Sequence, residues 1–69
     1  MNVVIVGLGN LGSAVATVLA NNGHSVTAWE FNQAVVDEVN QQHKNSVYQP
    51  AVAMPSSIVA TSDMQQLNI

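Results

Sequence analysis

The chain has 69 residues and no cysteine, so it forms at most one small domain with no disulfide framework and no thiolate metal site. Its residues are 48% hydrophobic but only 7% charged, with Lys44 as the single basic side chain and a formal net charge of -3. Nucleic acids and anionic membrane surfaces are bound through clusters of Lys and Arg, so the composition predicts neither partner. Because small domains bury little surface, we expect self-association, as a dimer or by strand exchange, to add stability.

The apolar N-terminal segment, Met1–Leu8, does not have the pattern of a targeting sequence. No basic residues precede it, and glycine interrupts the apolar run at once, whereas a secretory signal needs a basic start and a longer apolar core. No stretch approaches the ~20 apolar residues of a membrane-spanning helix. We therefore expect a cytoplasmic location.

The first predicted unit is a strand followed by a helix. Val3–Val6 is a short β-branched run of the kind that is buried on both faces of a parallel sheet. After Gly7 the apolar residues recur at helical spacing, at Leu11, Ala14, Val15, Val18 and Leu19. The polar residues of this segment fall on the other side, at Ser13, Thr17 and Asn21. This pattern predicts an amphipathic helix with its apolar side against the core, and Gly23 suits a left-handed C-terminal cap.

The remaining elements continue the alternation of strands and helices. Ser25–Trp29 is typical of a second strand, and Asn32 can cap a second helix that extends to about Gln41. Residues 43–56 are expected to be irregular because two prolines break any helix there. Ser57–Thr61 is a candidate third strand, and the S-x-x-Q spacing of Ser62–Gln65 predicts the start of a third helix.

The order β-α-β-α-β-α predicts the fold class, which is α/β. Strands that alternate with helices form parallel sheets with crossover connections. We expect residues 1–69 to form a single partial domain of this class. It would consist of a three-stranded parallel sheet flanked by helices and be truncated before a fourth strand.

The glycine-rich segment between the first strand and the first helix carries the chemistry. Gly7, Gly9 and Gly12 match the dinucleotide-binding fingerprint G-x-G-x-x-G. The motif alone is weak, but here it follows a strand, opens a helix and is followed by an acidic residue at the end of the next strand. That residue is Glu30, 18 positions after Gly12, where about 20 are expected. The segment therefore predicts a dinucleotide site, and residues 1–69 are expected to be a single partial dinucleotide-binding (Rossmann) domain.

Each residue of the fingerprint has a physical role. Gly7 permits the tight turn out of the strand, Gly9 lets the backbone approach a pyrophosphate, and Gly12 lets the helix pack closely on the strand. The amides at the helix start, from about Asn10 to Gly12, present positive partial charge to phosphate groups. The predicted cofactor-binding residues are Gly7, Leu8, Gly9, Asn10, Leu11, Gly12, Glu30 and Phe31.

Glu30 predicts which dinucleotide is bound. Its carboxylate would accept hydrogen bonds from the adenosine ribose hydroxyls and repel a 2′-phosphate, and Phe31 and Asn32 supply no cation. NAD is therefore favoured over NADP. Two simpler interpretations stay open, namely that the glycines make only a structural turn and that Glu30 is an ordinary solvated carboxylate. No nucleophile-base pair, catalytic residue or metal site is predicted.

The chain resembles the N-terminal part of the NAD(P)-dependent glycerol-3-phosphate dehydrogenase family. The resemblance rests on the glycine fingerprint, its continuation through residues 13–16 and 22–26, and a more discriminating later stretch. That stretch, Asn45–Pro50 followed by Met54–Pro55, is similar to the family's N-x-x-[YF]-L-P pattern with a second proline five residues on. Gln49 replaces the usual leucine, Leu11 replaces a frequent aromatic residue, and Glu30–Asn32 lacks the basic residue of many members.

The resemblance implies a parent reaction of hydride transfer between NAD and glycerol 3-phosphate or dihydroxyacetone phosphate. The family's catalytic lysines and helical substrate domain would follow residue 69, so none of its catalytic residues can be assigned here. We therefore expect an oxidoreductase fragment that binds NAD but is inactive alone. The alternative is a non-enzymatic, self-associating Rossmann module with vestigial nucleotide binding.

Overall fold

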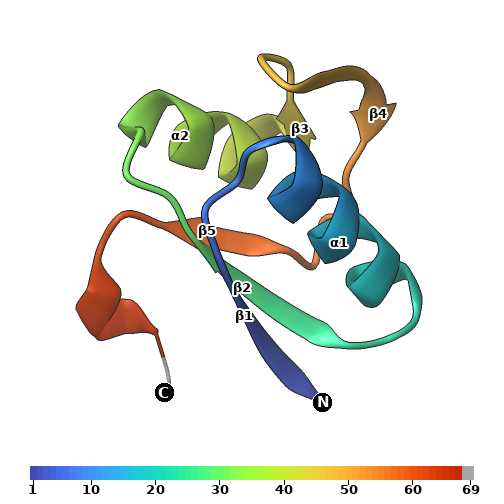
Figure 1. Cartoon of the computed structure of the whole chain (residues 1–69), viewed down its shortest axis with the longest axis vertical. Coiled ribbons are helices and arrows are strands. Elements are labelled where there is room, and N and C mark those ends of the chain that lie inside the picture. Colours follow the sequence, from blue (N-terminus) through green and yellow to red (C-terminus); the bar gives the residue numbers. More distant parts are fainter. Residues whose placement is uncertain (68–69) are drawn as a thin grey trace.

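The computed structural model describes residues 1–67, with the backbone alone described for residues 49–52 (Figure 1). The strands are β1 (Asn2–Val6), β2 (Ser25–Trp29), β3 (Lys44–Asn45), β4 (Gln49–Ala53) and β5 (Val59–Thr61). The helices are α1 (Asn10–Asn21), α2 (Gln33–Gln42) and the short 3₁₀ helix η1 (Met64–Gln66).

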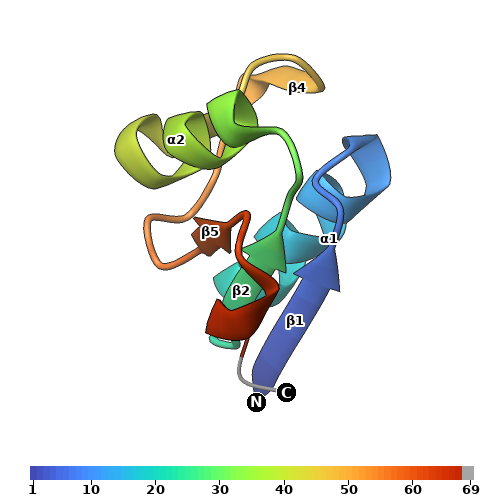
Figure 2. The same cartoon turned by 90° about the vertical axis from the view of Figure 1, so that its left-hand side faces the viewer.

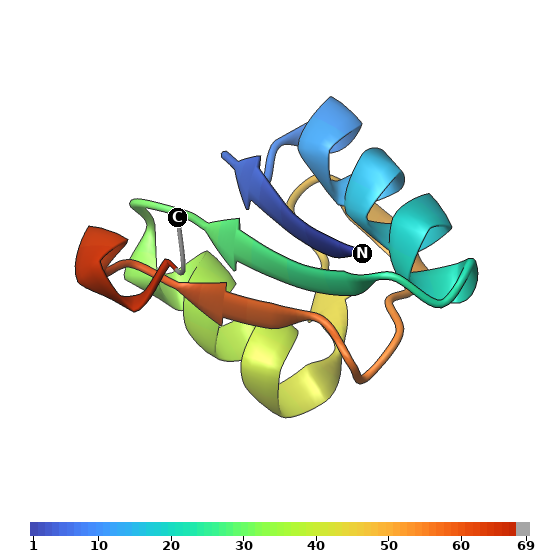
Figure 3. The same ribbon diagram turned by 90° about the horizontal axis from the view of Figure 1, so that it is seen from below.

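The main sheet has three parallel strands in the order β1-β2-β5, which confirms the predicted fold class. In the register, Val3 pairs with Val26 and Thr27 pairs with Val59. Figures 2 and 3 show α1 and α2 on opposite faces of this sheet. Parallel strands bring their carboxyl ends to one edge of the sheet, so the segments that follow β1, β2 and β5 meet there.

The hydrophobic core includes residues of α1, α2 and the sheet and extends to the segment that follows β1. Its fully or nearly fully buried members are Leu8, Ala16, Val26, Ala28, Val35, Val36, Val39, Met54, Ile58 and Ala60. The second helix follows the prediction closely, since Asn32 Oδ1 accepts a hydrogen bond from the Ala34 amide at 3.0 Å and caps it. The cap holds the segment between β2 and α2 at the start of the helix.

The predicted orientation of the first helix is wrong. The residues of α1 that are buried are Ser13 and Ala16, whereas Leu11 is 77% exposed and Val18 is 59% exposed. The small side chains of Ser13 and Ala16 let α1 approach the sheet closely, so the side of the helix that carries them is the buried side. Leu11, Val15 and Val18 form what we call the outer apolar face of α1. The expectation that β1 is buried on both faces is also wrong, because Val3, Val4 and Ile5 are only partly buried and Val6 is exposed.

Two further corrections concern the second half of the chain. The segment expected to be irregular contains β3 and β4, which pair in antiparallel fashion with Asn45 opposite Gln49. Its prolines do not prevent this pairing, because proline is tolerated in edge strands. The third strand is confirmed over Val59–Thr61. The predicted third helix is only the 3₁₀ turn η1, and its cap is Asp63 rather than Ser62.

Candidate functional site

The candidate site is the segment Gly7–Gly12, here called the glycine loop, which joins β1 to α1. Gly7 has a φ of 92°, a left-handed conformation that favours glycine, so the predicted tight turn is confirmed. The Gly7 amide donates to the Trp29 carbonyl oxygen at 2.8 Å, which holds the start of the loop beside the end of β2. The loop therefore lies at the carboxyl edge of the sheet, where ligands bind in open α/β folds.

Gly12 and Gly9 need to be glycine for different reasons. A Cβ at Gly12 would overlap the carbonyl oxygen of Gly7, so Gly12 allows α1 to begin against the end of β1. A Cβ at Gly9 would meet no atom of the described chain within 4 Å, and Gly9 is the N-cap of α1 without a side-chain cap. The backbone of Gly9 thus faces open space at a helix N-terminus, which suits the close approach of an anionic group.

Leu8 anchors the glycine loop from inside. Its side chain is fully buried in the core, and its amide donates to Glu30 Oε1 at 2.8 Å. Its carbonyl oxygen accepts from Asn45 Nδ2 at 2.8 Å and from Ser13 Oγ at 3.3 Å. Both polar groups of one loop residue are therefore held by buried side chains, which keeps the loop conformation fixed before any ligand arrives.

Glu30 lies at the end of β2, directly beside the loop, as the fingerprint predicts. It is only 5% exposed, and its second carboxylate oxygen accepts from the Asn32 amide at 2.9 Å. The structure thus gives Glu30 a role that the sequence did not indicate, because it joins the glycine loop to the start of α2. A carboxylate oxygen accepts more than one hydrogen bond, so these two contacts leave acceptor capacity for a ligand.

The other predicted binding residues are Asn10, Leu11 and Phe31, which adjoin the glycine loop or Glu30 in the sequence. Asn10 and Leu11 begin α1, and the Leu11 side chain points into solvent. Phe31 follows Glu30 directly and is 78% exposed, so its ring is available at the edge of the site. The structure therefore brings the glycine loop and Glu30 together through a hydrogen bond and leaves Phe31 accessible beside them.

Asn45 is the site residue that sequence reasoning missed. It lies in β3, is fully buried, and contacts both Leu8 and Ser13. The contact with Leu8 spans 37 positions, so no local pattern could have revealed it. The available signal was its place as the first residue of the Asn45–Pro50 stretch that resembles the family pattern, to which sequence reasoning assigned no role at the site.

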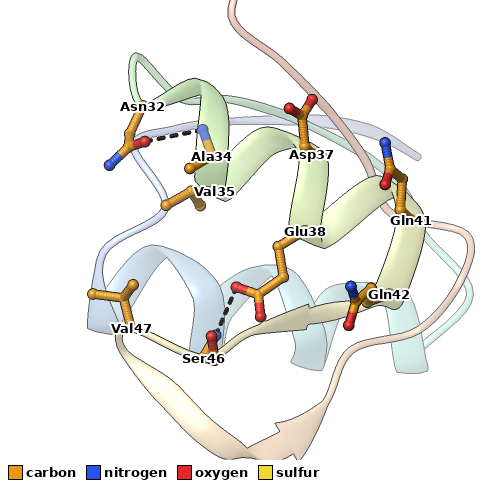
Figure 4. A pocket seen from close by; sticks show the side chains of 9 residues that line it. All are labelled: Asn32, Ala34, Val35, Asp37, Glu38, Gln41, Gln42, Ser46 and Val47. Atoms are coloured by element: carbon orange, nitrogen blue, oxygen red, sulfur yellow. Dashed lines mark hydrogen bonds between the residues drawn. The ribbon is translucent and has the colours of Figure 1, made fainter.

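A separate hollow of about 500 Å³ lies between α2 and the turn after β3 (Figure 4). Glu38 points across it toward Ser46, whose amide donates to Glu38 Oε1 at 3.0 Å. Hydrogen bonds from the Ser46 hydroxyl and amide lower the pKa of Glu38, with a smaller contribution from Lys44. The hollow is lined by residues of α2, its N-cap and this turn, so it is distinct from the glycine loop.

Metal sites and membrane-spanning helices are both absent from residues 1–67. Within this range, no three His, Cys, Asp or Glu side chains are grouped so that they could hold a metal ion. No helix in the same range has the length and apolar character needed to cross a membrane.

The sequence matches one protein family over residues 2–68, described as the NAD-dependent glycerol-3-phosphate dehydrogenase N-terminus. Among curated relatives are the glycerol-3-phosphate dehydrogenases (NAD(P)+) of Bacillus thuringiensis strain Al Hakam and Bacillus cereus strain AH187. Each is 44% identical over 64 residues, covering 93% of this chain and 19% of the relative. The chain thus spans about a fifth of the length of these relatives.

Solved structures give a consistent result. The glycerol-3-phosphate dehydrogenase of Coxiella burnetii superposes with a TM-score of 0.84 at 33% identity, covering 93% of this chain and 20% of that one. The Plasmodium falciparum enzyme also superposes with a TM-score of 0.84, at 32% identity, covering 97% of this chain and 21% of that one. The similarity therefore includes almost all of the present chain.

Proposed function

The chain belongs to the NAD-dependent glycerol-3-phosphate dehydrogenase N-terminal family, and on that premise we propose that it binds NAD at the glycine loop. The observation that carries the proposal is the open space at Gly9, at the N-terminus of a 12-residue helix. Backbone amides and the helix dipole favour a pyrophosphate there, and a chain with one lysine must depend on such donors.

The residues present fit each part of the dinucleotide. The amides that follow Gly9 would donate to the pyrophosphate, and Gly12 would keep the helix start at the end of β1. Glu30 would accept from the adenosine ribose with the acceptor capacity left by its two backbone contacts. Phe31 would offer an exposed ring at the edge of the site. Bound NAD would supply the hydride-accepting nicotinamide, while these side chains hold and orient the rest.

The charge of Glu30 supports a preference for NAD over NADP. A buried carboxylate beside the ribose repels a 2′-phosphate, and neither Phe31 nor Asn32 offers a compensating cation. The named relatives use NAD(P)+, so this preference would be a property of the present chain.

We further propose that the parent reaction is hydride transfer between NAD and glycerol 3-phosphate or dihydroxyacetone phosphate. The support is the name shared by the relatives. The 69-residue chain by itself is proposed to be inactive, because hydride transfer requires a substrate held against the nicotinamide and the chain spans 19% of those relatives. Reduction of NAD by this chain with glycerol 3-phosphate, followed by absorbance, would contradict the proposal.

Binding is tested by calorimetric titration of NAD, with NADP in parallel, and by the NMR amide shifts of the glycine loop. The matched variant is Gly9→Ala, whose Cβ meets no chain atom but would occupy the space assigned to the pyrophosphate. We expect saturable NAD binding that shifts the loop amides and weakens about tenfold in the variant, equivalent to about 1.4 kcal/mol. Unchanged affinity in Gly9→Ala would place the dinucleotide elsewhere, and absence of binding at millimolar NAD would reject the site.

A second candidate function, the self-associating module, is favoured by one observation. The outer apolar face of α1 is exposed next to β1, which pairs on one side only within the described residues. Exposed apolar surface beside an unpaired strand edge is a common site of association between copies. Sedimentation over a range of concentrations tests this candidate, and a monomer at every concentration would exclude it.

A further inference from the structure

Asn45 connects a distant part of the chain to the glycine loop. It is 0% exposed, and its Nδ2 donates to the Leu8 carbonyl oxygen and to Ser13 Oγ, each at 2.8 Å. The Leu8 carbonyl can only accept, so the Nδ2 side of the Asn45 amide must face the loop. Ser13 Oγ in turn donates to the same Leu8 carbonyl at 3.3 Å, which closes a small buried network beneath the loop.

This contact is maintained although it leaves another polar atom without a partner. Within the described residues, Asn45 Oδ1 is buried and makes no hydrogen bond. A buried acceptor without a partner is unfavourable, and an apolar side chain of similar size would avoid that cost. The amide is therefore better explained by what its Nδ2 does to Leu8 than by a contribution to packing.

The consequence for the loop follows from peptide geometry. The peptide between Leu8 and Gly9 is trans and planar, so its C=O and N–H groups point in opposite directions. Since Asn45 holds the Leu8 carbonyl toward the interior, the Gly9 N–H points away from that buried contact. A Cβ at Gly9 would meet no atom of the described chain within 4 Å, so the backbone there is accessible to a ligand. Glu30 fixes the preceding peptide in the same way through the Leu8 amide.

We propose that Asn45 is a positioning residue for dinucleotide binding, which holds the Leu8–Gly9 peptide so that the Gly9 amide donates to the pyrophosphate. This inference rests on the proposed function of the glycine loop. Asn45 itself stays beneath the loop and acts through Leu8, so it need not touch the cofactor.

The decisive variant is Asn45→Asp, which keeps the size of the side chain but changes its hydrogen-bonding capacity. An ionised Asp has no proton to donate and would repel the Leu8 carbonyl, whereas a protonated Asp can donate one hydrogen bond. We expect NAD affinity to fall tenfold or more at neutral pH and to recover as the pH is lowered. The Gly9 amide resonance should move from its wild-type position and return over the same pH range. If Asn45 served stability alone, the dissociation constant for NAD would equal that of wild type wherever the variant is folded.

The chain offers a matched control in Asn40. Its side chain donates to the Ala60 carbonyl and accepts from the Ala60 amide, each at 2.8 Å, so it joins α2 to β5 away from the loop. Asn40→Asp should lower stability without changing the dissociation constant for NAD at a pH where the variant is folded. If Asn45→Asp binds NAD like wild type at every pH, the inference is overturned while the proposed function stands. If wild type binds no NAD, both are overturned.

A measurement on the wild-type protein covers the case in which Asn45→Asp does not fold. The side-chain amide protons of Asn45 should exchange slowly with solvent, because both are hydrogen-bonded in a buried position. Addition of NAD should shift the Gly9 amide and the Asn45 side-chain amide together. Saturable NAD binding that leaves the Gly9 amide unshifted would overturn the inference without the variant.

Discussion

Gly12 lies so close to Gly7 that a Cβ at position 12 would overlap the Gly7 carbonyl oxygen. The clash is with backbone rather than with the end of a flexible side chain, so relief requires a shift of either β1 or α1. The same two residues begin and end the glycine loop. This contact therefore links the packing of α1 against β1 to the geometry of the site.

The first prediction is that Gly12→Ala destabilises the fold by about 1–3 kcal/mol, the usual cost of added volume in a packed region. Gly9→Ala is the matched control, because Gly9 has a φ of -77°, which alanine can adopt, and a Cβ there would meet no atom of the described chain within 4 Å. Alanine makes the unfolded chain less flexible but is a poorer N-cap than glycine, so the two effects oppose each other and the net change should stay below about 1 kcal/mol. Urea denaturation of both variants measures the difference, and equal stabilities would contradict the packing role of Gly12.

The second prediction concerns Glu30→Gln. The Leu8 and Asn32 amides donate to different oxygens of Glu30, and glutamine replaces one of these oxygens with an NH₂ donor, so in the present geometry one of the two amides loses its acceptor. The loss is expected to cost about 1–3 kcal/mol and to speed hydrogen exchange at whichever amide is released. Asp37→Asn, an exposed change on α2, serves as the control. If Glu30→Gln is as stable as Asp37→Asn, the two backbone contacts do not stabilise the fold.

The third prediction tests dinucleotide preference at Phe31. Phe31→Arg would place a cation beside Glu30 at an exposed position, where it can pair with a 2′-phosphate. We expect affinity for NADP to rise several-fold relative to NAD, while Phe31→Gln does not favour NADP. Parallel titrations of both cofactors give the ratio. An unchanged ratio in the arginine variant would mean that the ribose lies away from Phe31.

The fourth prediction is a pH effect at Glu38. Hydrogen bonds from Ser46 lower the pKa of Glu38, so its ionised form is favoured in the folded state. A lowered folded-state pKa stabilises the fold above the unfolded pKa, and this contribution is lost as pH falls through the folded value. Glu38→Gln should therefore reduce the loss of stability between neutral and acidic pH, whereas Asp37→Asn should not reproduce that change. Urea denaturation at several pH values measures the free energy of unfolding as a function of pH. If this free energy depends on pH identically in wild type and Glu38→Gln, the effect is disproved.

The fifth prediction addresses self-association through the outer apolar face of α1. Val18→Gln adds a polar group at an exposed position, so it should change the stability of the monomer by less than about 0.5 kcal/mol. It should shift any concentration-dependent association toward the monomer, while Met64→Gln, an exposed change on η1, should not. Analytical ultracentrifugation compares the three proteins. Equal association in all of them would exclude this face as the contact.

Much of the site could be predicted because its signals are local. The β-branched strand, the glycine spacing and the acidic residue at the end of the next strand lie within 28 consecutive residues, from Val3 to Glu30. The left-handed φ angles at Gly7 and Gly23 and the Asn32 cap also follow from neighbouring residues. In each case the residue type itself, together with neighbours a few positions away, determines the backbone conformation or the hydrogen bond.

The sequence by itself therefore determined the order of the main strands and helices, the family resemblance and the position of the glycine loop. Only the tertiary structure decided which side of α1 is buried, since helical spacing groups apolar residues without showing which surface covers them. It also decided that β3 pairs with β4 and that Asn45 meets Leu8. These contacts form between residues that only the folded chain brings together. Their energies therefore depend on partners that a local sequence pattern does not specify.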